Sequence, residues 1–193
     1  MDELTRRRFL ERTGWLALAG FAAQLPARWL DAARATALKP DLVHDTINGL
    51  VAFVVPGPDA YSKAQGESSS TPGGIAAGTT QAFIDTVDLF LKASPPFSVT
   101  VAALLNGTAK QLPPGGTKFQ SPFANLSFAQ KGEVFRRLES LTDPEAGAIR
   151  FLAGNLPGLI AFLAYSEPKV GWKLAHYSGT ADGRPELKGY FRA

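Results

Sequence analysis

The chain has 193 residues, no cysteine and a formal net charge of +3. The lack of cysteine excludes disulfides, thiolate catalysis and cysteine-held iron–sulfur or haem groups. The first 37 residues hold six arginines and four acidic residues, so the rest of the chain has 14 basic against 13 acidic side chains. This near balance gives no electrostatic footprint for nucleic acid or for an anionic membrane.

The N-terminus carries paired arginines, Arg6 and Arg7, followed by Phe9 and Leu10. These four residues match the twin-arginine export signal, whose usual pattern is Ser/Thr-Arg-Arg-x-Phe-Leu-Lys, with Glu11 in place of the last lysine. Proteins of that export class cross the membrane already folded, through the twin-arginine translocase and often with a cofactor or partner attached. The signal therefore predicts a periplasmic, cell-envelope or extracellular protein.

An apolar stretch at residues 14–23 follows the arginines. It is about ten residues long, which is too short to cross a bilayer core of about 30 Å as a helix. Small residues at 33–37 fit an A-x-A cleavage pattern. We therefore assign residues 1–37 to a signal peptide and residues 38–193 to a single helical domain. The alternative is an amphipathic basic N-terminal helix.

Five helices are predicted in the domain from apolar residues at helical spacing. The third contains β-branched Val99, Thr100 and Val101, so a strand is possible there. The fold class is all-α: an irregular helical domain of about five helices with long Gly/Pro-rich loops. The predicted helices run from about Pro40 to Val55, Ile75 to Ala93, Ser98 to Asn106, Ser127 to Leu141 and Asp143 to Tyr165.

The amino-acid composition predicts two long loops, and a capping motif predicts the start of one helix. Residues 59–74 are rich in Ser, Gly and Pro and predict either a functional, mobile loop or a plain surface excursion. Residues 111–125 predict an ordered loop pinned by aromatic side chains. Ser127 and Gln130 have the spacing of a capping box, which predicts the start of the fourth helix.

The fifth helix is apolar on every side, and we expect Pro157 to bend or break it. A helix without a polar face is either the centre of the core or is covered by another chain. The tail after it is rich in aromatics and glycine, which suit an interface, although Trp172 and Tyr177 could equally plug the end of the domain's own core. The candidate interface residues are Leu156, Phe162, Tyr165, Trp172 and Tyr177.

No residue pattern indicates catalysis or a cofactor in this chain. The two histidines lie on different predicted elements, and no His/Asp/Glu cluster has metal-ligand spacing. Asp85 and Asp88 are better explained as a solvated helix face, with Asp88 paired to Lys92. His44 next to Asp45 is better explained as a surface or capped pair. We therefore predict no catalytic residue, no metal ligand and no cofactor in the chain itself.

The order of motifs resembles the small-subunit family typified by gluconate 2-dehydrogenase subunit 3 and the gamma subunit of bacterial FAD-dependent glucose dehydrogenase. The likeness spans most of the chain after the signal, through diffuse motifs. The residues that carry it are Asp45–Ile47, Val55–Pro56, Phe83–Asp85, Leu126, Ser127, Gln130 and Tyr165–Gly179, after the twin-arginine signal.

Members of this family accompany a large FAD-dependent flavoprotein of the glucose–methanol–choline (GMC) oxidoreductase type, often together with a cytochrome subunit. The flavoprotein lacks its own signal and leaves the cell attached to the small subunit. The resemblance thus implies a non-catalytic accessory subunit that binds, stabilises and co-exports the flavoprotein, with FAD on the partner. The other hypotheses are a solitary secreted binding domain and an enzyme with an unrecognised site.

Overall fold

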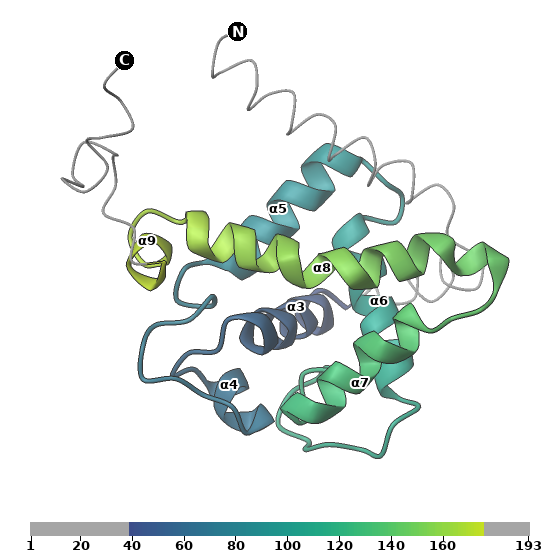
Figure 1. Cartoon of the computed structure of the whole chain (residues 1–193), viewed down its shortest axis with the longest axis horizontal. Helices are drawn as coiled ribbons and strands as arrows, with labels where there is room; N and C mark the ends of the chain where they lie inside the picture. Colours follow the sequence, from purple (N-terminus) through teal and green to yellow (C-terminus); the bar gives the residue numbers. More distant parts are fainter. Residues whose placement is uncertain (1–38, 176–193) are drawn as a thin grey trace, which may run out of the picture.

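The computed structural model describes residues 39–175, and its regular elements are helices (Figure 1). No strand occurs in this range, so the expected all-α fold is confirmed, and the third predicted element is a helix. Arg6, Arg7, Phe9, Leu10 and Tyr177 lie outside the described residues. The helices are α3 (Pro40–Val54), α4 (Ala60–Gln65), α5 (Thr79–Leu91), α6 (Phe97–Ala109), α7 (Phe128–Glu139), α8 (Gly147–Ser166) and α9 (Gly171–Leu174), with a 3-10 turn at Pro144–Ala146 before α8.

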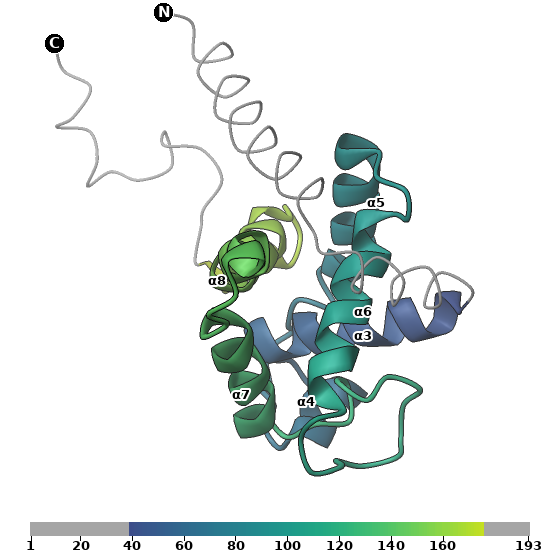
Figure 2. The ribbon, with the colours of Figure 1, turned by 90° about the vertical axis from the view of Figure 1, so that its right-hand side faces the viewer.

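Helix α6 occupies the centre of the domain. All of its residues except Gly107 are buried, and it contacts α3, α5 and α7. A helix surrounded in this way needs no solvent-facing polar side, so apolar residues and a few buried polar ones occupy all of its sides. The sequence predicts that the fifth helix is either the centre of the core or covered by another chain. That helix, α8, crosses the outside of the bundle in front of α3 and α6 (Figures 1 and 2).

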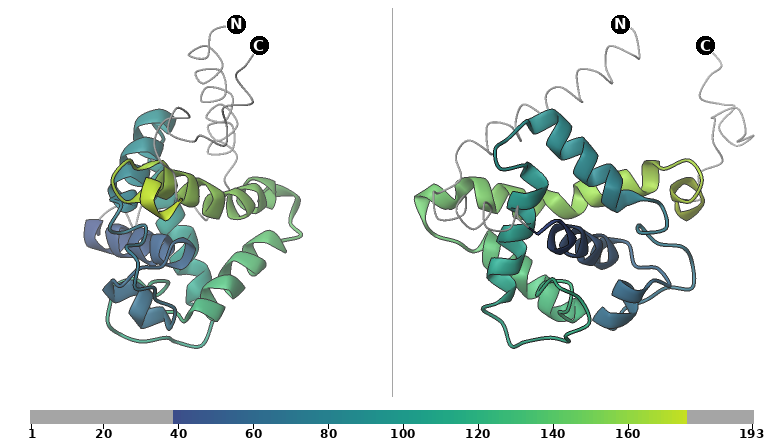
Figure 3. Two further views of the ribbon diagram at one scale, coloured as in Figure 1. Left: turned by 60° about the vertical axis from the view of Figure 1, so that its left-hand side comes forward. Right: turned by 180° about the vertical axis from the view of Figure 1, so that it is seen from behind.

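Helix α3 packs against α4, α5, α6 and α8. Seen from behind, α3 faces the viewer between α4, α5 and α6 (Figure 3). Ile47, Leu50 and Val51 are fully buried. A Cβ atom at Gly49 would lie 2.8 Å from the Cα atom of Ala124, so this glycine lets the segment before α7 pack directly on α3.

Buried polar side chains fix that segment in place. Asn106 on α6 donates to the Thr46 hydroxyl on α3 at 2.8 Å and accepts from the Ser121 hydroxyl at 2.7 Å. The same Asn106 oxygen accepts the backbone N–H of Phe123 at 3.1 Å. Because every member of the network is paired, burying these polar groups costs little.

Three details differ from the sequence prediction. The segment expected as an irregular loop at 59–74 contains α4, whose N-terminus is capped by the Asp59 carboxylate accepting from the N–H groups of Tyr61 and Ser62. Pro157 lies inside α8 without breaking it. Helix α9 follows in the tail that showed little periodicity. The capping box at Ser127 and Gln130 is confirmed, with both of its hydrogen bonds present.

Candidate partner-binding face

Helix α8 has two sides of opposite environment. One side is buried against α3, α5 and α7. The other side, which we call the outer face, remains in solvent although it is apolar: Phe162 is 66% exposed, Tyr165 42% and Phe151 36%. In Figures 1 and 2 no other described helix covers this side. The buried side consists of Ile149, Leu152, Leu156, Ile160 and Ala164, and the outer face of Phe151, Gly154, Gly158, Phe162 and Tyr165.

Helix α8 contributes no charged side chain to the outer face. Between Phe151 and Ser166 the sequence has no Asp, Glu, Lys or Arg. Within the described residues, α8 is the one helix long and apolar enough to cross a membrane by length and composition. One side of the helix packs into the core, so folding of the domain explains why that side is apolar. Packing among the described residues does not explain why the outer side is also apolar. Exposed apolar patches of this kind mark interaction sites.

Two glycines make a gap in the middle of the outer face. A Cβ atom at Gly158 would meet no atom within 4 Å, and one at Gly154 would meet only the Glu139 carboxylate, at 3.8 Å. Phe151 and Phe162 stand at either end of this gap. A protruding side chain of another molecule could therefore approach the α8 backbone closely between two aromatic rings.

The structure separates the five candidate interface residues. Phe162 and Tyr165 lie on the outer face. Leu156 is only 2% exposed and belongs to the core, because it lies on the buried side of α8. Its assignment to the interface is therefore wrong. Trp172 is partly buried on α9, and its backbone N–H donates to the Glu167 carbonyl at 2.9 Å. Tyr177 lies outside the described residues.

A pocket of about 260 Å³ lies beyond the C-terminal end of α8. It is formed where α9 meets the segment before α5, and no sequence pattern predicted this pocket. Helix α9 is held close because Gly171 packs against the Ala164 carbonyl. The Glu167 carboxylate accepts the N–H groups of Val170 and Gly171; mainly the hydrogen bond from Val170 lowers the pKa of this carboxyl. The pocket is lined by Thr71, Pro72, Lys169, Val170, Lys173 and Leu174.

Sequence reasoning also missed a buried ammonium group, Lys131 on α7. Its side chain is fully buried. The Nζ atom donates to the Gly49 carbonyl at 3.1 Å and to Gln65 Oε1 at 2.8 Å, and lies 5.5 Å from the centre of the Phe123 ring. Burial lowers the pKa of Lys131 to about 7, against the opposing pull of the Asp59 carboxylate. The sequence does contain a signal for this burial. Lys131 precedes the buried Val134 and Phe135 by three and four residues, which places it on the same side of α7.

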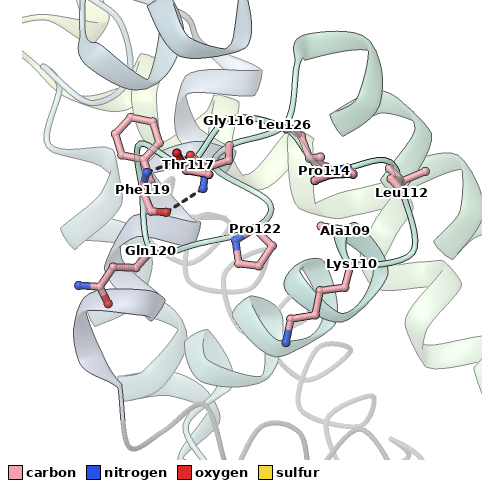
Figure 4. Close-up of a pocket in the computed structure, with 12 residues that line it drawn as sticks. Ala109, Lys110, Leu112, Pro114, Gly116, Thr117, Phe119, Gln120, Pro122 and Leu126 are labelled. Carbon is pink, nitrogen blue, oxygen red and sulfur yellow. Dashed lines mark hydrogen bonds between the residues drawn. The ribbon is translucent and has the colours of Figure 1, made fainter.

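A second pocket, of about 410 Å³, opens at the loop between α6 and α7 (Figure 4). Asn125 shapes its wall, since its side chain accepts from the Phe119 N–H and donates to the Phe119 carbonyl. The loop is thus ordered, as predicted. The lining is mostly apolar, with only a few polar groups such as Lys110 and Gln120. These groups do not converge on one point in Figure 4, so we assign no chemistry to this pocket.

The acidic residues considered for catalysis have structural contacts. Asp88 accepts from both the N–H and the hydroxyl of Ser98, at 2.8 and 2.6 Å, and so caps α6. No salt bridge joins it to Lys92 among the described residues, and the expected pair is therefore replaced by a cap. Asp45 accepts from the Tyr61 hydroxyl and from the Gln120 N–H. Within residues 39–175 no three His, Cys, Asp or Glu side chains are grouped closely enough to hold a metal ion.

The motifs behind the family resemblance fall on separate elements. Asp45–Ile47 lies within α3, Phe83–Asp85 within α5, and Ser127 and Gln130 at the start of α7. These motifs fix helix ends and core packing, and only the last motif, which begins at Tyr165, reaches the outer face of α8. Comparisons with family models, with curated proteins and with solved structures found no match to this chain.

Proposed function

We propose that the chain is a non-catalytic accessory subunit that binds, stabilises and co-exports a FAD-dependent oxidoreductase of the GMC type. The observation that carries this proposal is the uncharged, uncovered outer face of α8. A secreted domain that keeps two large aromatic side chains in water has a reason to do so if another protein covers them.

Two further observations support the flavoprotein as the partner. The twin-arginine signal belongs to a route for folded cargo, which suits a complex that is assembled before export. The motif order resembles small subunits of flavoprotein dehydrogenases. In this proposal FAD, substrate and the reacting groups all belong to the partner, and this chain contributes attachment and stability. A cytochrome subunit could join the same complex through the partner.

The test is purification of the tagged full chain from its native host. Flavin absorbance and dye-linked dehydrogenase activity of the purified material identify the partner class. We expect a flavoprotein in near-equal molar amount. A clean monomer without flavin would overturn the proposal and favour a solitary binding domain, and substrate turnover by the chain alone would favour an enzyme.

A matched pair of variants locates the interface. Phe162 on α8 and Leu89 on α5 are both 66% exposed, so replacing either by serine should leave the fold intact. We expect Phe162→Ser to reduce the co-purified flavin about tenfold or more, as loss of an interface hot spot does. Leu89→Ser should leave it near the wild-type level. Equal retention of flavin by both variants would place the interface away from α8.

A further inference from the structure

The pocket beyond α8 combines an apolar floor with two positive charges. Pro72, Val170 and Leu174 supply the apolar surface, and Lys169 and Lys173, four residues apart in sequence, also line it. Figure 1 places α9, which carries Lys173, directly at the C-terminal end of α8. A segment of another protein that follows the outer face toward Tyr165 would therefore reach these lysines next.

Both ammonium groups are available for an incoming anion. Lys169 and Lys173 are exposed, and neither forms a side-chain hydrogen bond or salt bridge with any residue in the described range. The nearest carboxylate in sequence, Glu167, is already engaged by the N–H groups at the start of α9. Glu167 interacts electrostatically with Lys169, but neither lysine forms a salt bridge with a described residue, and two neighbouring cations favour binding of negative charge.

We propose, on the basis of the accessory function above, that the partner binds through an apolar segment followed by acidic residues. The apolar part covers the outer face of α8, with a side chain filling the gap at Gly154 and Gly158. The acidic part pairs with Lys169 and Lys173. This assignment gives the interface a direction, because an uncharged surface at one end and a cationic pocket at the other accept the segment in one orientation only.

The geometry favours a protein segment over an anionic lipid surface. The lysines border a concave pocket that is walled by Thr71 and Pro72 from a different part of the chain. A concave site of this kind receives a side chain or a chain end, whereas a bilayer surface is flat. The gap between Phe151 and Phe162 likewise matches a ridge of side chains.

The first test is zero-length cross-linking of the purified flavoprotein complex with a carbodiimide, which joins an amine to a carboxylate only when they are in direct contact. We expect Lys169 or Lys173 to be joined to an Asp or Glu of the partner that lies beside an apolar segment. Exposed Lys63 and Lys110 serve as internal controls. An intact flavoprotein complex in which these two lysines form no cross-link would overturn the acidic-segment proposal and leave the accessory function standing.

The second test uses the double variant Lys169→Gln, Lys173→Gln beside the matched double variant Lys63→Gln, Lys110→Gln. We expect the first to weaken binding of the partner about three- to tenfold at low salt and to flatten its salt dependence. The second should match the wild type. An unchanged affinity and salt dependence would overturn the proposal, and absence of any complex in the wild type would overturn both proposals.

Vesicles of phosphatidylglycerol and phosphatidylcholine provide the lipid arm of the test. Sedimentation of the chain with anionic vesicles, lost in the Lys169→Gln, Lys173→Gln variant, would assign the pocket to lipid and overturn the protein-segment proposal. We expect no sedimentation above the level seen with phosphatidylcholine alone.

Discussion

Lys131 is stabilised in the core by neutral acceptors. The Gly49 carbonyl and the Gln65 amide oxygen receive its N–H groups, and neither acceptor carries the full charge that would compensate a buried cation. A neutral amine can donate the same two hydrogen bonds without the cost of burying a charge. The depressed pKa of Lys131 follows from this arrangement.

The position of Lys131 makes the stability of the domain depend on pH. Its pKa is about 7 in the folded chain and about 10.4 in an unfolded one. Between these values the unfolded state binds more protons, so the free energy of unfolding rises with pH from about 7 to 10, by up to roughly 1.4 kcal/mol per pH unit. Urea unfolding at a series of pH values measures this slope. Lys131→Met should remove it, and a slope retained by that variant would show that another group is responsible.

Tyr61 has the opposite effect on the pH dependence of stability, above about pH 10. Burial, followed by its hydrogen bond to Asp45, raises the pKa of Tyr61 to about 12. A group whose pKa is raised in the folded state contributes stability below its unfolded value of about 10 and loses it between about 10 and 12. The contribution of these two groups to stability is therefore greatest near pH 10.

At the scale of the element, the two sides of α8 have opposite environments in one sequence. Leu156 and Phe162 are both large and apolar, yet their exposed fractions are 2% and 66%. Removing side-chain atoms should therefore affect folding at one position and association at the other. The distinction can be measured on the isolated chain and does not depend on the identity of the partner.

Truncation of Leu156 to alanine should lower the free energy of unfolding by about 2–5 kcal/mol, because it opens a cavity between α8 and its neighbours. Phe162→Ala should change that free energy by no more than about 0.5 kcal/mol, as surface substitutions usually do. Chemical denaturation of the two variants beside the wild type supplies the comparison. Equal losses at both positions would mean that the outer face is covered within the chain itself.

Sequence reasoning succeeded where a helix has its own local signal. The start of α3 has a proline in its first turn, and α7 has a capping box, so both were predicted closely. It failed for α4, because six residues are too few to show a period and the helix depends on the Asp59 cap. Pro157 was expected to bend or break α8. The packing of α8 against several helices compensates for the lost hydrogen bond, which costs about 3 kcal/mol.

Only part of the candidate site could be predicted, because the rest depends on contacts between residues that are distant in sequence. Composition shows that α8 is apolar throughout, but the side that faces solvent is decided by contacts with α3, α5 and α7. Phe162 and Tyr165 were therefore named together with Leu156, which turned out to be buried. The pocket at α9 depends on Thr71 and Lys173, which are about a hundred residues apart in sequence, and no local pattern joins them.

At the scale of the whole molecule, export should depend on the paired arginines. Replacing Arg6 and Arg7 together with lysine should leave the chain in the cytoplasm, since the twin-arginine translocase recognises that pair. The proposed flavoprotein partner should stay with it. Cell fractionation, with dehydrogenase activity as the marker for the partner, measures both. Normal export of the variant would show that a different route is used.

If the outer face of α8 binds a partner as proposed, it also links the supply of this chain to the supply of that partner. Copies made in excess keep Phe162 and Tyr165 in water, where the apolar faces of two copies attract each other and quality-control proteases find exposed aromatic side chains. Copies bound to a partner would avoid both self-association and proteolysis. Under the proposed accessory function, selective turnover would match the amount of this chain in the cell to that of its partner, without a dedicated regulator.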